Sequence, residues 1–200
     1  MMIIKYLPDL TMLSIISQRM MRKIKFKKRR AQNDIPELGD QLIPPGVTSS
    51  VFNGFVTSIN NQYGLQLKIH HEKNGGVACE WETARKFEGY PQTLHGGISF
   101  AILDELLAYA IFERYRTFAV TLSSKTQWLG RVKIGSKITA KAIVIRRFWR
   151  FVKVQGYIYN HKNHCVVSMA ATFYIPSKAE FGKLIDINLM PEEALPHCGI

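Results

Sequence analysis

The chain has few cysteines, and their arrangement argues against two classes of protein. Its 200 residues include three cysteines, Cys79, Cys165 and Cys198, an odd number at wide spacing with no Cys-x-x-Cys pair. Neither a disulfide framework nor a structural zinc site is therefore predicted. The histidines of segment 161–164 lack neighbouring carboxylates, so we expect no metal site there either. This cysteine usage favours a reducing compartment.

Long apolar runs are also missing. The longest candidate, residues 98–112, is interrupted by Asp104 and Glu105, so no transmembrane span is predicted. The apolar residues of the N-terminus precede its basic cluster, which is the reverse of the order in a secretory signal. We therefore expect a cytoplasmic protein.

Acidic residues are scarce, with 15 Asp and Glu against 27 Lys and Arg and a net charge of +12. Residues 1–30 contain nine basic residues and one acidic residue and so carry +8 of this charge. Most of the net charge therefore lies in the N-terminal tail, outside the expected globular domain. Apolar side chains recur at helical spacing within residues 9–24, which predicts a basic amphipathic segment. This segment either makes weak contact with a membrane surface or polyanion, or is a solvated or packed tail. No helix-turn-helix pattern precedes the linker, so nucleic acid is not favoured as a partner.

The remaining chain divides into three parts. Residues 31–50 are rich in Pro, Gly and Asp, which predicts a linker with little regular structure. Residues 51–176 form the expected globular domain, for which a 46% hydrophobic composition is sufficient. Residues 177–200 form a C-terminal extension with a short helix expected near residues 178–185.

Periodicity within the domain predicts an α+β fold. Alternating apolar residues over 65–69 and the turn at 74–76 lead into residues 77–83, as in a β-hairpin. A long helix is expected from Gly97 to about Arg114. Four strand-like runs follow, and we expect them to form a meander: residues 119–128, 137–147, 151–160 and 165–175. A curved antiparallel sheet wrapped around one long central helix fits this order.

The predicted helix carries an acid in an unusual setting. Apolar residues cover nearly all of its faces, which is typical of a buried helix. A buried carboxylate without partners costs several kcal/mol, so Asp104 must be paired, neutral or retained for a purpose. Glu105 points about 100° away from it, so only one of the two acids can face a given site.

His95, Gly96 and Gly97 stand at the start of this helix. Glycines allow another molecule to approach the free amides of a helix N-terminus, and these amides favour electron-rich oxygens. The segment therefore either polarises a carbonyl group or only makes a tight turn into the helix.

The motif Leu94-His95-Gly96-Gly97, an apolar helix and an acid nine residues after the histidine resemble the hotdog-fold acyl-CoA thioesterases. The resemblance is to the PaaI-like branch of the 4-hydroxybenzoyl-CoA thioesterase superfamily, and segments 121–129 and 133–138 fit the same pattern. It extends from about residue 56 to residue 175. It implies a hotdog fold and hydrolysis of an aryl or short to medium acyl-CoA to a carboxylic acid and free CoA. No cofactor is implied, because CoA is part of the substrate.

The resemblance also implies roles for individual residues. The amide of Gly96, with that of Gly97, would polarise the thioester carbonyl, and His95 would shape the turn. Asp104 would act as general base or as nucleophile. Thr121 would hold the water beside it, unless it is an ordinary strand threonine. Asp104 lies seven residues beyond Gly97, about 10 Å along a helix, so one chain cannot supply both groups. A homodimer, or a dimer of dimers, with sites shared between chains is expected.

Further expectations concern the rest of the substrate. Basic residues near strand ends could bind the CoA phosphates, and Arg131, Lys133 and Arg147 are the candidates. An acyl pocket is expected from Phe87, Tyr90, Leu94 and Tyr109. The chain departs from many relatives at Gly89, where they carry a side-chain amide that helps to grip the carbonyl.

Two other functions remain open. One is a non-catalytic acyl-CoA binding or sensing module on the same fold. The other is a hydratase, which needs an acid and a histidine paired around an enoyl group, whereas the glycine pair favours thioester hydrolysis.

Overall fold

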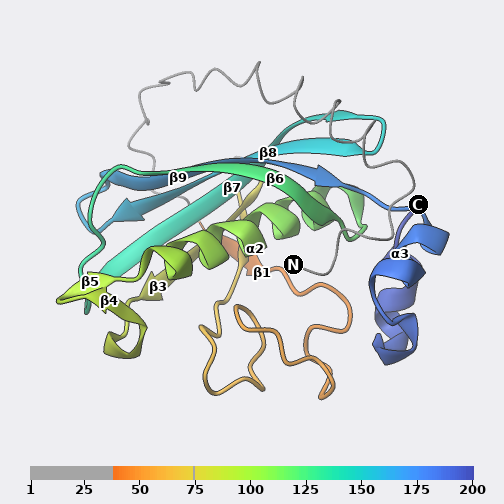
Figure 1. Ribbon diagram of the computed structural model, residues 1–200, viewed down its shortest axis with the longest axis horizontal. Helices are drawn as coiled ribbons and strands as arrows, with labels where there is room; N and C mark the ends of the chain where they lie inside the picture. The colour runs from red at the N-terminus through yellow and green to blue at the C-terminus, as the bar shows by residue number, and fades with distance from the viewer. Residues whose placement is uncertain (1–37, 74) are drawn as a thin grey trace.

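A seven-stranded antiparallel sheet curves around one long helix, as expected (Figure 1). The computed structural model describes residues 38–73 and 75–200, so the basic segment predicted within residues 1–30 lies outside the described residues. The sheet strands are β1 (Leu38–Gln41), β2 (His70–Glu72), β3 (Val77–Glu82), β6 (Val120–Trp128), β7 (Lys137–Phe148), β8 (Phe151–Asn160) and β9 (Cys165–Tyr174). A separate small hairpin joins β4 (Glu88–Tyr90) to β5 (Thr93–Leu94).

The central helix α2 spans Gly96–Tyr115 and packs on strands β3 and β6 to β9. Its N-cap is His95, whose side chain accepts a hydrogen bond from the Gly97 amide, and it ends at Arg116 in the left-handed conformation. Ile102, Leu103, Leu106, Leu107 and Ile111 are fully buried between the helix and the sheet. Burial of side chains on more than one face agrees with the apolar pattern of the sequence.

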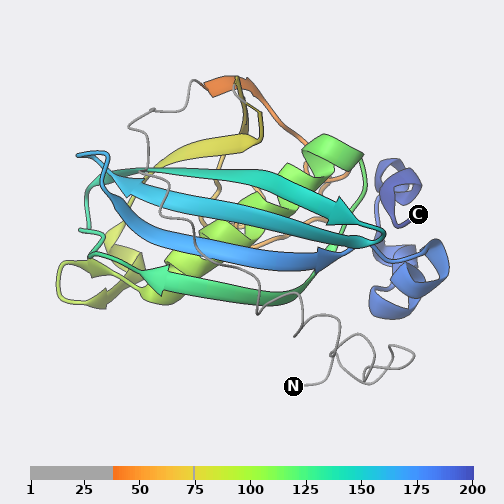
Figure 2. The same ribbon diagram turned by 90° about the horizontal axis from the view of Figure 1, so that it is seen from above.

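The strand order corrects the expected four-strand meander. The order is β1-β2-β3-β7-β8-β9-β6, so of the four strands after α2 three, β7, β8 and β9, are consecutive neighbours, whereas β6 pairs with β9 at the far edge (Figure 2). Alternation of apolar residues defines where a strand runs but not which strand it joins. With β6 at the edge, β7 and β8 lie in the middle of the sheet against α2.

The N-terminal part of the fold is only partly regular. Strands β2 and β3 form a hairpin around the expected turn, with His70 paired to Ala78. Its first strand is β2, whereas the sequence predicted a strand over residues 65–69. Those residues are not a strand, although the amides of Leu65 and Leu67 donate to the carbonyls of Phe55 and Val56. Strand β1 lies inside the predicted linker and pairs with β2, so this range has more regular structure than its composition suggests.

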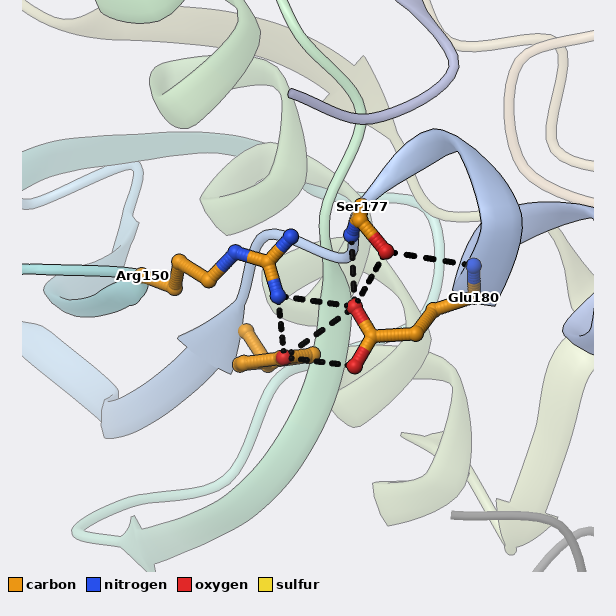
Figure 3. A network of polar contacts seen from close by, with 4 residues as sticks. Arg150, Ser177 and Glu180 are labelled. Atoms are coloured by element: carbon orange, nitrogen blue, oxygen red, sulfur yellow. Dashed lines mark hydrogen bonds and ion pairs between the residues drawn. The ribbon is translucent and has the colours of Figure 1, made fainter. Parts of the chain in front are cut away.

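The C-terminal extension begins with helix α3 (Lys178–Leu184), close to its expected position. Ser177 and Glu180 form a reciprocal capping box at its start. The Glu180 carboxylate also accepts hydrogen bonds from Arg150, at 2.8 Å, and from the Tyr174 hydroxyl, at 3.1 Å (Figure 3). This cluster attaches α3 to the end of the sheet. Two short 3₁₀ helices follow, over Ile187–Leu189 and Glu192–His197.

Within the described residues, no helix is long and apolar enough to cross a membrane.

Candidate active site

The acid singled out in the sequence meets a hydroxyl from the edge strand. The Thr121 hydroxyl, at the start of β6, donates a hydrogen bond of 2.9 Å to Oδ1 of Asp104 on α2. The pairing of β6 with β9 shifts register between Thr121 and Ser123, so the strand is irregular beside the acid. Bulges of this kind commonly re-aim a side chain near a functional site.

The surroundings of Asp104 disfavour its charged form. Burial raises the pKa of this carboxyl above its ordinary value of 3.8, and the hydrogen bond from Thr121 opposes that shift. A carboxylate with a raised pKa is a stronger base than one in water. Thr121 therefore orients the carboxylate, whereas burial increases its basicity.

The turn before α2 is fixed by His95. Its Nδ1 accepts the Gly97 amide at 3.0 Å, and its own amide donates to the Phe87 carbonyl at 2.9 Å. The Gly97 N–H is therefore already hydrogen-bonded. Within residues 38–73 and 75–200, the Gly96 amide has no acceptor. Of the two amides predicted to polarise a carbonyl, that of Gly96 is the free donor, and the role of both glycines stays a prediction.

The tight packing of this turn explains the missing amide side chain at position 89. A Cβ built on Gly89 would lie 3.0 Å from both Cα and Cδ2 of His95. Any side chain at position 89 would therefore press on the histidine that caps α2.

Trp128 is a neighbour of the site that the sequence did not reveal. Its indole N–H lies 3.4 Å from the Gly96 carbonyl, and a Cβ on Gly96 would meet Nε1 at 3.1 Å. The indole is 55% exposed although it covers the first residue of α2. Trp128 is the last residue of β6, and the sequence alone does not show that this strand ends beside the N-terminus of α2.

One chain does not join the two halves of the site. Gly96 and Asp104 lie eight residues apart on the regular helix α2, a rise of about 12 Å. A thioester that contacts both groups at hydrogen-bonding distance needs them on different chains.

Glu105 faces another environment, as the helical geometry predicts. Its Oε1 accepts a hydrogen bond of 3.0 Å from the buried Thr57. Burial raises the pKa of Glu105, the Thr57 bond opposes the shift, and the nearby charge of Asp104 adds to it. Glu105 is therefore held by a hydrogen bond within the fold, while Asp104 is bonded to Thr121.

The three basic residues proposed for CoA are not brought together in one chain. Lys133 bridges to Thr93, next to the start of α2, and Arg131 is two residues away. Arg147 instead stacks over Tyr115 at the other end of α2 and donates to the Trp149 carbonyl at 2.6 Å. A helix of 20 residues spans about 30 Å, so Arg147 cannot share a phosphate site with the other two within one chain.

A cavity of about 300 Å³ lies beside the C-terminal half of α2. It is lined by residues 44–47 and Phe52, by α2 side chains between Glu105 and Phe112, by residues 118–120, and by C-terminal residues between Phe181 and Ala194. Of the expected acyl-pocket residues only Tyr109 lines it. Phe87 and Leu94 are buried in the core, and Tyr90 is exposed.

Comparison with known proteins agrees with the resemblance at the level of the superfamily. The model of the thioesterase superfamily matches residues 91–167, which include α2, β6, β7 and β8. No curated protein sequence shows significant similarity to the chain.

Solved structures share the fold at low sequence identity. A thioesterase superfamily member 2 from zebra fish is 18% identical with a TM-score of 0.53, covering 59% of this chain and 91% of its own. The PaaI protein of the E. coli phenylacetic acid degradation operon is 21% identical with a TM-score of 0.51, covering 55% and 79%. A hypothetical thioesterase from Streptococcus pneumoniae TIGR4, solved with coenzyme A, is 19% identical with a TM-score of 0.51, covering 54% and 86%.

These likenesses establish that the chain has the hotdog fold. The family match and the fold together support the hotdog thioesterase superfamily.

Proposed function

We propose that the protein hydrolyses acyl-CoA thioesters to a carboxylic acid and free CoA, as a PaaI-like member of the superfamily. The observation that carries the proposal is the hydrogen-bonded pair of Asp104 and Thr121, combined with the unused Gly96 amide at the start of the same helix. A thioester needs both a donor for its carbonyl oxygen and a base or nucleophile for its carbon.

In this mechanism the site is shared by two copies of the chain. The Gly96 amide of one copy polarises the thioester carbonyl, and His95 holds the turn in which that amide is presented. Asp104 of the other copy, oriented by Thr121, either takes a proton from a water molecule that attacks the carbonyl carbon, or attacks that carbon itself to form a mixed anhydride that water then hydrolyses. In both routes the acyl–sulfur bond breaks, the acyl group leaves as a carboxylic acid, and the CoA thiolate takes up the proton that water gives up.

The neighbours support a CoA-containing substrate. The Streptococcus pneumoniae protein was solved with coenzyme A, and variants of it with one aspartate or one threonine changed to alanine have also been solved. For this chain, Arg131 and Lys133 lie near the start of α2, where they could contact the CoA phosphates. Arg147 could reach the same ligand only from the other copy.

A panel of aryl-CoA and fatty acyl-CoA thioesters, with a thiol reagent to detect released CoA, tests the proposal. We expect turnover with at least one member of the panel and loss of turnover in Asp104→Asn. Binding of acyl-CoA without release of thiol would instead support the non-catalytic sensing module.

A further inference from the structure

Two elements, α2 and β6, contribute both to the wall of the cavity and to the hydrogen-bonded pair of Asp104 and Thr121. On α2, Glu105 lines the cavity and directly follows Asp104. On the other wall, Val120 lines the cavity and directly precedes Thr121, which is bonded to Asp104. Asp104 and Thr121 do not line the cavity themselves, but consecutive Cα atoms are about 3.8 Å apart, so the cavity reaches to within one residue of the pair on both elements.

The wall of the cavity suits a hydrocarbon. Its side chains are those of Pro, Val, Ile, Met, Ala, Phe and Tyr, and Glu105 is the single acidic or basic residue among the described residues that line it. Burial raises the pKa of Glu105, which favours its neutral form, and Thr57 satisfies one of its oxygens. Phosphate or carboxylate groups would find no cationic partner in this wall.

The size of the cavity limits the length of the chain that it can hold. An apolar cavity of about 150 Å³ holds one benzene molecule, which has six carbons, so a cavity of about 300 Å³ accommodates on the order of ten carbon atoms. We propose that this cavity is the acyl-chain pocket and that the substrates are straight-chain, medium-length acyl-CoA thioesters of about ten carbons. This inference rests on the proposed hydrolysis.

Segments outside the family match close the pocket. Residues 44–52 and 181–194 lie beyond the matched range 91–167, yet both contribute to the wall. The second segment is attached to the sheet through the hydrogen bonds of Glu180 (Figure 3). The chain-length preference therefore depends on these two segments as well as on the matched domain, which supplies the α2 side of the wall.

Two substitutions in the full-length protein test the pocket in opposite directions. Ala108→Leu places a larger side chain in the cavity from α2, and Ile185→Ala removes part of the wall from a residue that is 40% exposed. Ala179→Leu is the control for Ala108→Leu, because Ala179 is exposed on α3 and does not line the cavity. The substrates are butyryl-, hexanoyl-, octanoyl-, decanoyl-, dodecanoyl- and palmitoyl-CoA, and binding of decanoate is measured in parallel by calorimetry.

We expect kcat/KM of the unmodified protein to be highest near decanoyl-CoA. Each buried methylene contributes about fourfold, so displacing three of them in Ala108→Leu should lower kcat/KM for decanoyl-CoA about 60-fold. Butyryl-CoA should be unaffected. Ile185→Ala should move the optimum to longer chains, and Ala179→Leu should change nothing.

The possible failures can be told apart. Hydrolysis with the same chain-length profile in all four proteins would overturn the pocket and leave the proposed function intact. If no thioester is hydrolysed but decanoate binds the unmodified protein and Asp104→Asn, and not Ala108→Leu, the hydrolytic function is wrong and the pocket is supported as a site for an alkyl chain. Absence of decanoate binding, together with an unaltered profile in Ile185→Ala, overturns the pocket.

Discussion

At the scale of single residues, Asp104 combines two opposing influences. Burial raises the pKa of its carboxyl, whereas the Thr121 hydroxyl stabilises the charged form. Because the folded state holds the proton more tightly than the unfolded chain, stability contributed by this group is lost as pH rises from 3.8 through the folded pKa. Ionisation of Asp104 therefore costs the folded protein stability.

Asp104→Asn should separate catalysis from folding. The amide oxygen can still accept the Thr121 hydrogen bond, but the side chain is neither base nor nucleophile, so kcat should fall about 10²- to 10⁴-fold. The melting temperature at pH 7 should be no lower than that of the unmodified protein, and the difference should shrink as pH falls toward 3.8. Steady-state kinetics and thermal unfolding at several pH values check both outcomes. Near-normal turnover would exclude Asp104 and make Glu105 the next candidate.

Thr121→Ala should be milder and should change the pH profile. Loss of one orienting hydrogen bond should lower kcat about tenfold. Without that bond the pKa of Asp104 rises further, so the acidic limb of kcat/KM against pH should move to higher pH. Thr121→Ser keeps the hydroxyl, so kcat and the pH of the acidic limb should both match those of the unmodified protein. An identical pH limb in Thr121→Ala would make Thr121 an ordinary strand residue.

Residue-level analysis of the sequence placed Thr121 beside Asp104, as the structure has it, and the catalytic roles of the two residues stay predictions. Asp104 could be found because a carboxyl interrupts an apolar helix, and Thr121 through the family resemblance. The use of the Gly97 amide by His95, and the packing of Trp128 on Gly96, depend on side-chain rotamers and on contacts across 32 residues. No pattern in the sequence encodes those contacts.

At the scale of elements, attachment of α3 depends on one partly buried carboxylate. Burial alone would raise the pKa of Glu180, but hydrogen bonds from Ser177 and Tyr174 and the charge of Arg150 outweigh it, so the pKa is lowered below 4.5. Such a group stabilises the fold above its unfolded pKa, and this contribution is lost as pH falls through the folded pKa. Acidification below pH 4.5 should therefore loosen α3 first.

Glu180→Gln tests this attachment without removing the helix cap. Glutamine can still occupy the third position of the capping box, but it cannot neutralise Arg150. The free energy of unfolding should fall by about 2 kcal/mol, and α3 amides should exchange faster with solvent at pH 7. Glu192→Gln, at an exposed position in the same extension, is the control. Unchanged amide exchange in α3 would mean that the apolar contacts of Phe181 hold the helix on the sheet without the Glu180–Arg150 ion pair.

Element boundaries followed from periodicity far better than element partners did. Helix α2 and strands β7, β8 and β9 were expected within a residue or two of their observed limits. The place of β6 at the sheet edge, the strand β1 and the closing of the cavity by α3 were not, because each depends on packing between distant segments. Alternation defines the faces of a strand, whereas its neighbour is set by the whole core.

At the scale of the whole molecule, the proposed site is incomplete in one chain. The helical rise from Gly96 to Asp104 is about 12 Å, so the proposed mechanism requires two copies of the chain. Two symmetric copies would contain two equivalent sites, each with one amide and one carboxyl from different chains.

Mixing two inactive variants tests this shared site. Gly96→Val places a side chain beside the free amide, and the exposed indole of Trp128 can move to admit it. Asp104→Asn removes the carboxyl. Each variant alone has no complete site, but a heterodimer contains one site with both lesions and one with neither. With equal amounts and random exchange, half of the dimers are mixed, so activity should return to about a quarter of that of the unmodified protein.

Differently tagged subunits, copurified and sized by gel filtration, show that the heterodimers have formed. Thermal unfolding of Gly96→Val alone shows that the variant folds. Recovery must depend on exchange, so mixing under conditions that prevent subunit exchange should give no activity. The shared-site model predicts one intact site in each heterodimer. Verified heterodimers without activity would therefore contradict the model.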